Sequence, residues 1–324
     1  MDDRLEQVVE KYGFTVQNRY RARGAVIFET DEGLRLMRQH EKSGEHLEFE
    51  NQVREMLARK GLCMTDRIVP NLDGELATHW ETGEYYVMYQ WYAGNECDYR
   101  SRPMLCQAAD TLGKIHIALR DVREEPLIPE ETLLQRYERH NSEMKRIWRY
   151  MKQKKKKTAF ERYAVSCYGF FSERASQAQE RISQSAYFHE KGMCLTDVCH
   201  GEYNYHNLIF TPAGVAVTNF ERAGYGIQLM DFAYFFRKVM EKNNWDMEKG
   251  KAVVASYRAV AGMSLAAGEF LAAVLSYPEK YWKLLNHYMN GKKTWIPDKN
   301  LEKMRAVREQ EDRKMRFLQI LPHL

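Results

Sequence analysis

The residues best suited to chemistry lie in two short segments, 199–210 and 217–221. The first segment holds a carboxylate, Glu202, and an amide, Asn207, five positions later. The second holds Asn219, which precedes a phenylalanine. Phosphoryl transfer uses a carboxylate beside the attacking hydroxyl, a metal-binding Asn five residues on, and an Asp-Phe pair on the next hairpin strand. The spacing therefore predicts a catalytic loop and a metal-binding segment of this kind.

Two chemical groups differ from that pattern. Glu202, the candidate base or hydroxyl-orienting group, is one methylene longer than Asp, and a shift of about 1 Å at a reacting centre can cost on the order of 100-fold in rate. Asn219 stands where a metal-binding Asp is expected, so a full negative charge is missing beside the cation. Glu221 lies two residues on, on the same face if the segment is a strand. The predicted metal ligands are Asn207, Asn219 and Glu221.

A second candidate site would hold the phosphates of a nucleotide. In phosphotransferases a strand Lys contacts the α and β phosphates and a helix Glu holds that Lys. Here Arg38 ends the strand that follows an Asp/Gly turn, and the next helix offers Glu50, with Glu48 as an alternative. An Arg–Glu pair keeps the charge but presents a planar fork instead of a compact ammonium. No glycine-rich phosphate loop precedes the strand, because segment 21–24 holds a single glycine, Gly24. An Arg on a strand surface would have the same sequence.

Segment 88–94 is the candidate hinge for an adenine base, with Gln90 and Tyr92 as the candidate nucleotide-binding residues. Its backbone groups could meet the edge of the base. A strand that simply leaves a sheet would have the same sequence, so this alternative stays open.

Strands and helices divide the chain into two parts. Before residue 94 the patterns predict mostly strands with two helices; after it they predict helices and one hairpin that turns at 211–214. We expect an α+β protein with a small antiparallel-sheet lobe, 1–93, and a larger, mostly helical lobe, 94–324. The predicted elements are helices at 5–12, 45–60, 103–119, 130–153, 160–188 and from 231 onward, and strands at 25–30, 34–38, 68–69, 76–79 and 85–91.

Composition narrows the classes of partner. The chain of 324 residues has a formal charge of +4 and no RRM or zinc-finger pattern, so no nucleic-acid partner is expected. Its longest apolar stretch, 261–275, is too short to span a membrane, and the acidic N-terminus predicts no signal peptide. Six scattered cysteines favour reduced thiols in a cytoplasmic setting. The basic run 152–157 predicts an exposed segment, with an acidic partner as the alternative.

Five segments carry a resemblance that covers essentially the whole chain: 199–207 (CHGEYNYHN), 218–221 (TNFE), 237–245 (RKVMEKNNW), 277–282 (YPEKYW) and 292–295 (KKTW). They resemble the kinase-like superfamily of aminoglycoside phosphotransferases and choline kinases. Within that superfamily the chain is similar to the CotS family of spore-coat proteins.

The resemblance implies a two-lobed protein-kinase-like fold, expression during sporulation in the cytoplasm of the mother cell, and association with other proteins of the spore coat. It also implies ATP and Mg²⁺ as cofactors and a small-molecule ligand in the interlobe cleft. The departures at Glu202, Asn219 and Arg38, with the missing glycine-rich loop, predict a pseudokinase with weak or no phosphotransfer. The alternative is an active phosphotransferase that acts on a hydroxyl of an aminoglycoside-, choline- or sugar-like substrate.

Overall fold

The computed structural model describes residues 3–22, 24–80, 83–120, 131–192, 197–291 and 296–324. The chain forms two compact units: Met1–Val122 with Cys199–Ala223, and Arg123–Val198 with Gly224–Leu324. The first unit thus joins the sheet-forming segment to the segment that carries Glu202 and Glu221. The division into lobes after residue 93 stays a prediction. The fold class is confirmed as α+β, with an antiparallel sheet in the N-terminal region and helices through most of the C-terminal region.

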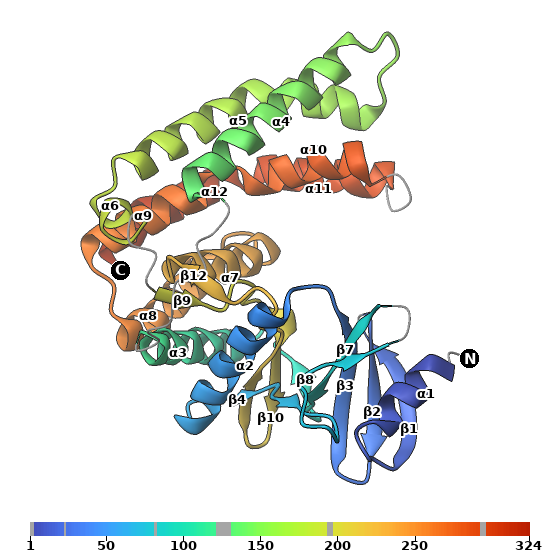
Figure 1. Cartoon of the computed structure of the whole chain (residues 1–324). Coiled ribbons are helices and arrows are strands. Elements are labelled where there is room, and N and C mark those ends of the chain that lie inside the picture. Colours follow the sequence, from blue (N-terminus) through green and yellow to red (C-terminus); the bar gives the residue numbers. More distant parts are fainter. Residues whose placement is uncertain (1–2, 23, 81–82, 121–130, 193–196, 292–295) are drawn as a thin grey trace. The chain divides into compact units, whose positions relative to one another are not determined.

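A six-stranded antiparallel sheet dominates the first unit (Figure 1). The strands run in the order β1-β2-β3-β7-β5, and β6 also pairs with β7. Strand β1 was not predicted, because its sequence VQNRYRA is largely polar and its edge position needs only one partner strand. The strands are β1 (Val16–Ala22), β2 (Ala25–Thr30), β3 (Gly33–His40), β5 (Ile68–Val69), β6 (Thr78–His79) and β7 (Tyr85–Gln90).

Side chains alternate between the two faces of this sheet, as the period of two in a strand requires. One face packs Phe28, Met37 and Met88 against α1 (Asp3–Glu10), which contributes Val8 and Val9. The neighbouring residues in the same strands point the other way. Ile27, Leu36, Val87 and Tyr89 form a second cluster with Leu47 of α2 (Gly44–Arg59). Two small cores therefore fix the sheet and the helix that carries Glu50.

A second, four-stranded sheet of the first unit has the order β4-β11-β10-β8. Its strands are β4 (Met64–Thr65), β8 (Asn95–Glu96), β10 (Leu208–Thr211) and β11 (Gly214–Val217). The predicted hairpin is confirmed, with Thr211 opposite Gly214 at its turn. The loop that precedes β10 is held in place by helix α3 (Arg102–Leu119), because the buried Tyr203 of this loop donates its hydroxyl to the carbonyl of Ala108 at 2.7 Å.

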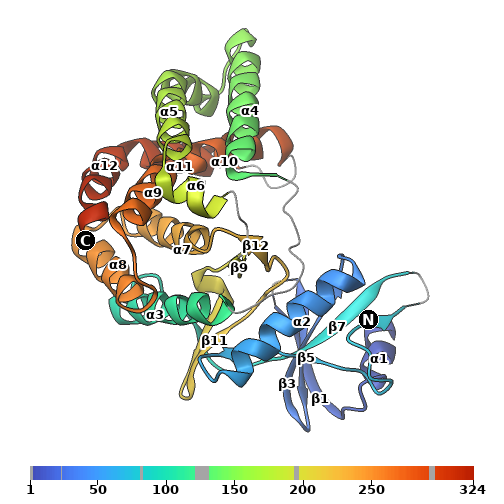
Figure 2. The same ribbon diagram turned by 60° about the vertical axis from the view of Figure 1, so that its left-hand side comes forward.

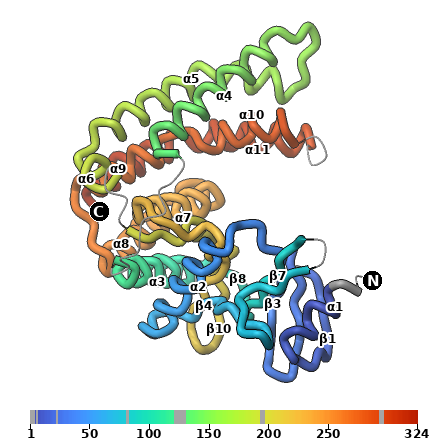
Figure 3. Tube along the Cα trace, in the orientation of Figure 1, coloured from blue at the N-terminus to red at the C-terminus, as the bar shows by residue number. Residues whose placement is uncertain are grey.

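The second unit consists almost entirely of helices. Helices α4 and α5 run side by side as a hairpin (Figures 2 and 3), and α9 lies among α5, α7 and α12 with most of its residues buried. Its helices are α4 (Leu133–Gln153), α5 (Ala159–Ser183), α6 (Ala186–Gly192), α7 (Leu229–Lys242), α8 (Met247–Ala261), α9 (Leu265–Ser276), α10 (Glu279–Asn290), α11 (Pro297–Glu309) and α12 (Glu311–Ile320). Two short strands, β9 (Asp197–Cys199) and β12 (Gly224–Gly226), pair with each other.

One expected element was wrong: segment 160–188 is not a single helix. Helix α5 ends at Ser183, and α6 begins at Ala186. The physical reason is a new start signal, because the hydroxyl of Ser185 accepts a hydrogen bond from the backbone N–H of Phe188 at 3.3 Å.

Three further expectations concern membrane spans, the cysteines and the resemblance segments. None of the helices in the described ranges is both long and apolar enough to cross a bilayer. Cys63, Cys97, Cys106 and Cys167 carry free thiols, as predicted. Cys194 and the resemblance segment 292–295 lie outside the described residues.

Candidate functional site

The loop that carries Glu202 is fixed by a buried histidine. His200 Nε2 lies 3.1 Å from the carbonyl of Thr218, and its Nδ1 accepts the backbone N–H of Glu202 at 3.2 Å. Gly201 has a φ of +77°, and a Cβ there would lie 1.9 Å from the carbonyl oxygen of Arg222. The loop and the chain beyond the hairpin therefore pack backbone to backbone, which only glycine permits.

Asn207 ties the loop to the hairpin. Its side-chain amide donates to the carbonyl of Glu202 at 3.0 Å, and its own carbonyl accepts the backbone N–H of Thr218 at 2.9 Å. The spacing of five residues thus serves to brace the loop: the amide nitrogen of Asn207 is committed to the backbone of Glu202.

Asn219 stands at the end of the hairpin in a left-handed conformation, with a φ of 67°. Asn tolerates this conformation better than most residues. Its backbone N–H donates to Asp66 Oδ2 at 2.7 Å, and its side-chain nitrogen lies 3.5 Å from Glu202 Oε2. The structure therefore brings Glu202, Asn207 and Asn219 together.

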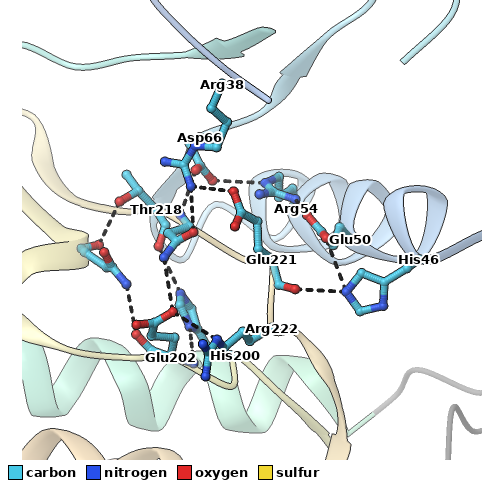
Figure 4. Close-up of polar contacts among 12 residues, drawn as sticks. Arg38, His46, Glu50, Arg54, Asp66, His200, Glu202, Thr218, Glu221 and Arg222 are labelled. Atoms are coloured by element: carbon cyan, nitrogen blue, oxygen red, sulfur yellow. Dashed lines mark hydrogen bonds and ion pairs between the residues drawn. The ribbon is translucent and has the colours of Figure 1, made fainter. Parts of the chain in front are cut away.

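Arg38 reaches the same cluster from strand β3. Its Nη1 donates to Asn219 Oδ1 at 2.8 Å and to Glu221 Oε1 at 2.6 Å, and its guanidinium lies over the ring of Tyr89 at 5.5 Å (Figure 4). Burial by itself would lower the pKa of Arg38, but the charge and hydrogen bond of Glu221 outweigh it and raise that pKa. Arg38 is a permanent cation between two of the predicted metal ligands.

Glu50 does not pair with Arg38, its expected partner. It is fully buried on α2, where Arg54 Nη1 lies 3.0 Å from one carboxylate oxygen and His46 Nε2 lies 3.3 Å from the other. Burial by itself would raise the pKa of Glu50, but His46 and Arg54 together lower it. The expected pair is replaced because Arg54, one helical turn further on, supplies a closer cation.

The candidate hinge residues Gln90 and Tyr92 both donate hydrogen bonds to backbone carbonyls. The backbone N–H of Gln90 donates to the carbonyl of Arg67 at 2.8 Å, and the hydroxyl of Tyr92 donates to the carbonyl of Thr65 at 2.7 Å. Burial raises the pKa of Tyr92 to about 12. These bonds fix the segment 88–94 against the chain around β4 and β5, and its role toward a nucleotide stays a prediction.

The geometry can be compared with known proteins. Residues 5–321 match the family described as "Spore coat putative kinase YutH". The chain belongs to this family. No curated protein matches its sequence.

Solved structures show that the YutH-family chain has the fold of the kinase-like superfamily. An aminoglycoside phosphotransferase from Alicyclobacillus acidocaldarius is similar with a TM-score of 0.83 and 18% identity, over 98% of this chain and 96% of that one. Amicoumacin kinase hAmiN, solved with AMP-PNP, Ca²⁺ and Ami, is similar with a TM-score of 0.60 and 13% identity, over 95% of this chain and 92% of that one. Choline kinase from Cryptosporidium parvum Iowa II is similar with a TM-score of 0.55 and 14% identity, over 96% of this chain and 92% of that one.

Sequence reasoning missed Arg54 and Asp66. Arg54 Nε donates to Asp66 Oδ1 at 3.0 Å, and its guanidinium lies 5.1 Å from the ring centres of both Tyr89 and Phe220. Asp66 uses its second oxygen to hold Asn219. The one available signal was an Arg at a core-facing position of an amphipathic helix, four residues after Glu50, which predicts a buried ion pair.

Arg222 was also missed. It is mostly exposed, and its Nε lies 3.4 Å from Glu202 Oε2. The candidate catalytic carboxylate therefore has one cation beside it. A position directly after the predicted metal-binding segment gave no sequence signal for this contact, because it depends on the close approach of Gly201 to Arg222.

The three predicted metal ligands do not fit a magnesium ion. Mg²⁺ requires oxygen ligands in a near-ideal octahedron, with carboxylates preferred. Asn219 Oδ1 and Glu221 Oε1 both accept from the Arg38 guanidinium, and Asn207 offers a neutral amide. Across the described ranges, no group of three or more His, Cys, Asp or Glu side chains could hold a metal ion.

Proposed function

We propose that this YutH-family chain is a spore-coat-associated pseudokinase, with weak or no phosphotransfer. The observation that carries the proposal is the position of Arg38. Phosphoryl transfer in this fold relies on metal ions that bridge the phosphates and neutralise the charge that develops. Here a guanidinium bonds to both Asn219 and Glu221, and neither Asn207 nor Asn219 supplies a carboxylate.

The shape of the site supports a retained scaffold with altered chemistry. His200, Gly201 and Asn207 still fix the loop that carries Glu202, so the geometry is maintained by bonds that need no metal. The changed groups are those that would contact the cation. A binding function for ATP or another small molecule is therefore compatible with the site, whereas fast transfer is not.

A turnover assay tests this proposal. Full-length protein, ATP and Mg²⁺ are incubated with an aminoglycoside, choline or a sugar, and ADP release is measured. We expect the wild-type rate to equal that of Glu202→Ala within error. A wild-type rate that falls on the order of 100-fold in Glu202→Ala would overturn the proposal.

The alternative is an active small-molecule phosphotransferase. It is favoured by the Glu202 carboxylate, which is 29% exposed and faces Asn219 and Arg222 (Figure 4). In this case Glu202 would orient the acceptor hydroxyl, and Asn207 with Glu221 would hold the metal ion. It requires Arg38 to leave Glu221 and contact the phosphates of the nucleotide, so it predicts that the ADP release measured above falls in Glu202→Ala and in Arg38→Gln.

Two features support association with other spore-coat proteins, and the first of them also supports a place in the mother cell and the coat. One is membership of the family. The other is an exposed basic segment at the end of α4, which fits an acidic partner.

A further inference from the structure

Arg38 has hydrogen-bond donors that the protein does not use. Both of its bonds, to Asn219 and Glu221, leave from Nη1. Within the part of the chain that the structure describes, no hydrogen bond is made by its Nε or Nη2. The side chain is 22% exposed and lies over Tyr89. A guanidinium with free donors in a fixed plane is a bidentate partner for phosphate oxygens.

The charges around Arg38 favour an anionic ligand over a divalent cation. Arg38 with Glu221 is a neutral pair, and so is Arg222 with Glu202. A divalent cation placed between Asn219 and Glu221 would have to displace the guanidinium and then lie beside it, like charge against like charge. An anionic phosphate beside the outer edge of the guanidinium meets neither obstacle.

We infer that Arg38 is a tethered cation that takes the place of the divalent metal, so that the site binds a nucleoside di- or triphosphate in its metal-free form. This inference rests on the proposed function in one respect: it places the nucleotide at the site of a retained kinase fold. It goes beyond it by naming the form of the ligand and the residue that neutralises it.

Glu221 then has a role opposite to that of a metal ligand. Its carboxylate competes with phosphate for Arg38, since it takes one of the guanidinium donors at 2.6 Å. The Glu221→Gln substitution removes that negative charge and keeps the shape. If Arg38 is the cation, Glu221→Gln tightens nucleotide binding. If Glu221 binds a metal, the same substitution weakens it.

The experiment is a titration of the full-length protein with a fluorescent ATP analogue, once in EDTA and once in Mg²⁺. We expect the dissociation constant in EDTA to be no larger than the dissociation constant in Mg²⁺. In EDTA we expect Arg38→Gln to weaken binding about tenfold or more, because charge-assisted hydrogen bonds are lost. We expect Glu221→Gln to tighten it severalfold. The matched control is Lys114→Gln, which removes an exposed cation paired with Asp110 at 2.7 Å on α3.

The possible results separate the two proposals. A requirement for Mg²⁺, weaker binding by Glu221→Gln, or no binding in either buffer overturns the role of Arg38 and leaves the absence of phosphotransfer standing. Equal losses in Arg38→Gln and Lys114→Gln also overturn it. ADP release that depends on Glu202 in the turnover assay overturns the pseudokinase proposal instead. Circular dichroism of each variant checks that the fold is kept.

Discussion

At the residue scale, one carboxylate organises the candidate site. Asp66 accepts Arg54 Nε with one oxygen and the backbone N–H of Asn219 with the other. The same contact holds Asn219 in its left-handed conformation, from which its side chain reaches both Arg38 and Glu202. Asp66 is therefore a positioning residue: it acts on the site through Asn219.

Arg54→Met tests this arrangement. The substitution leaves Glu50 and Asp66 buried without their cation, so we expect a loss of about 3–5 kcal/mol in the free energy of unfolding. The control is Arg67→Met, which removes an exposed pair with Glu55 and should cost at most about 1 kcal/mol. Urea unfolding of both variants measures the difference. Similar losses would contradict the buried network.

Gly201→Ala tests the close approach in the loop. The new Cβ would lie 1.9 Å from the carbonyl of Arg222, in a left-handed conformation. Gly61→Ala is the matched control, because Gly61 has a φ of +64° and a Cβ added there would meet nothing within 4 Å. We expect about 1–2 kcal/mol of destabilisation from conformational strain alone at Gly61, and clearly more at Gly201. Thermal unfolding distinguishes the two; equal shifts would show that the loop has room.

At the element scale, aromatic and imidazole rings join α4 to the start of α10. Tyr137 stacks on Tyr277 with ring centroids 3.8 Å apart, and His140 stacks on Trp282 at 3.5 Å. His140 is buried, and burial lowers its pKa to about 4. The charged groups that face it are Glu279, 3.8 Å from its Nδ1, and Glu143, Arg139 and Arg136. This part of the second unit therefore packs around a neutral histidine.

A pH dependence of stability follows. Between about pH 6.5 and pH 4 the unfolded chain takes up a proton at His140 and the folded chain does not, so stability falls as the pH falls. The full effect is about 3 kcal/mol. We expect His140→Gln to flatten this part of the profile of urea unfolding against pH. His79→Gln, a substitution on the surface of β6, is the control, and an unaltered slope in His140→Gln would contradict the prediction.

At the scale of the whole molecule, the basic charge is concentrated. Residues 144–157 hold eight Lys and Arg and no Asp or Glu, whereas the formal charge of the chain is +4. The remaining residues therefore sum to −4 (+4 minus +8). The exposed members lie along the end of α4 and the segment after it: Lys145, Arg146, Arg149, Lys152, Lys155 and Lys156. A cavity of about 470 Å³, lined in part by Lys145, Arg146, Arg149 and Tyr150, lies on this surface.

This surface predicts a salt-sensitive association with acidic partners in the coat. We expect Lys155→Glu with Lys156→Glu to weaken binding to isolated coat layers, and about 0.5–1 M salt to release the wild-type protein, because salt at about 1 M shortens the screening length to about 3 Å. The control reverses two exposed lysines elsewhere, Lys11→Glu with Lys299→Glu. Equal retention of both double variants in a sedimentation assay would refute the role of the basic segment.

The sequence predicted most elements because their signals are local. Helix α3 and the hairpin β10–β11 each carry their own period, caps and turn within a short stretch. Strand β1 was missed because its partner β2, and not its own sequence, makes it a strand. The same limit applied to Glu50: its position on α2 could be predicted, but its partner could not.

By itself the sequence determined that Glu202, Asn207 and Asn219 would converge, since a short loop and a tight hairpin leave them few other arrangements. Only the tertiary structure decided what Arg38 contacts. Its partners Asn219 and Glu221 follow it by 181 and 183 positions. Glu50 lies nearer to Arg38 in the sequence and was an equally good candidate partner, but it forms its ion pair with Arg54. Which cation meets which carboxylate depends on distances that exist only after the tertiary structure has formed, because ion-pair energies fall steeply with separation and solvent exposure.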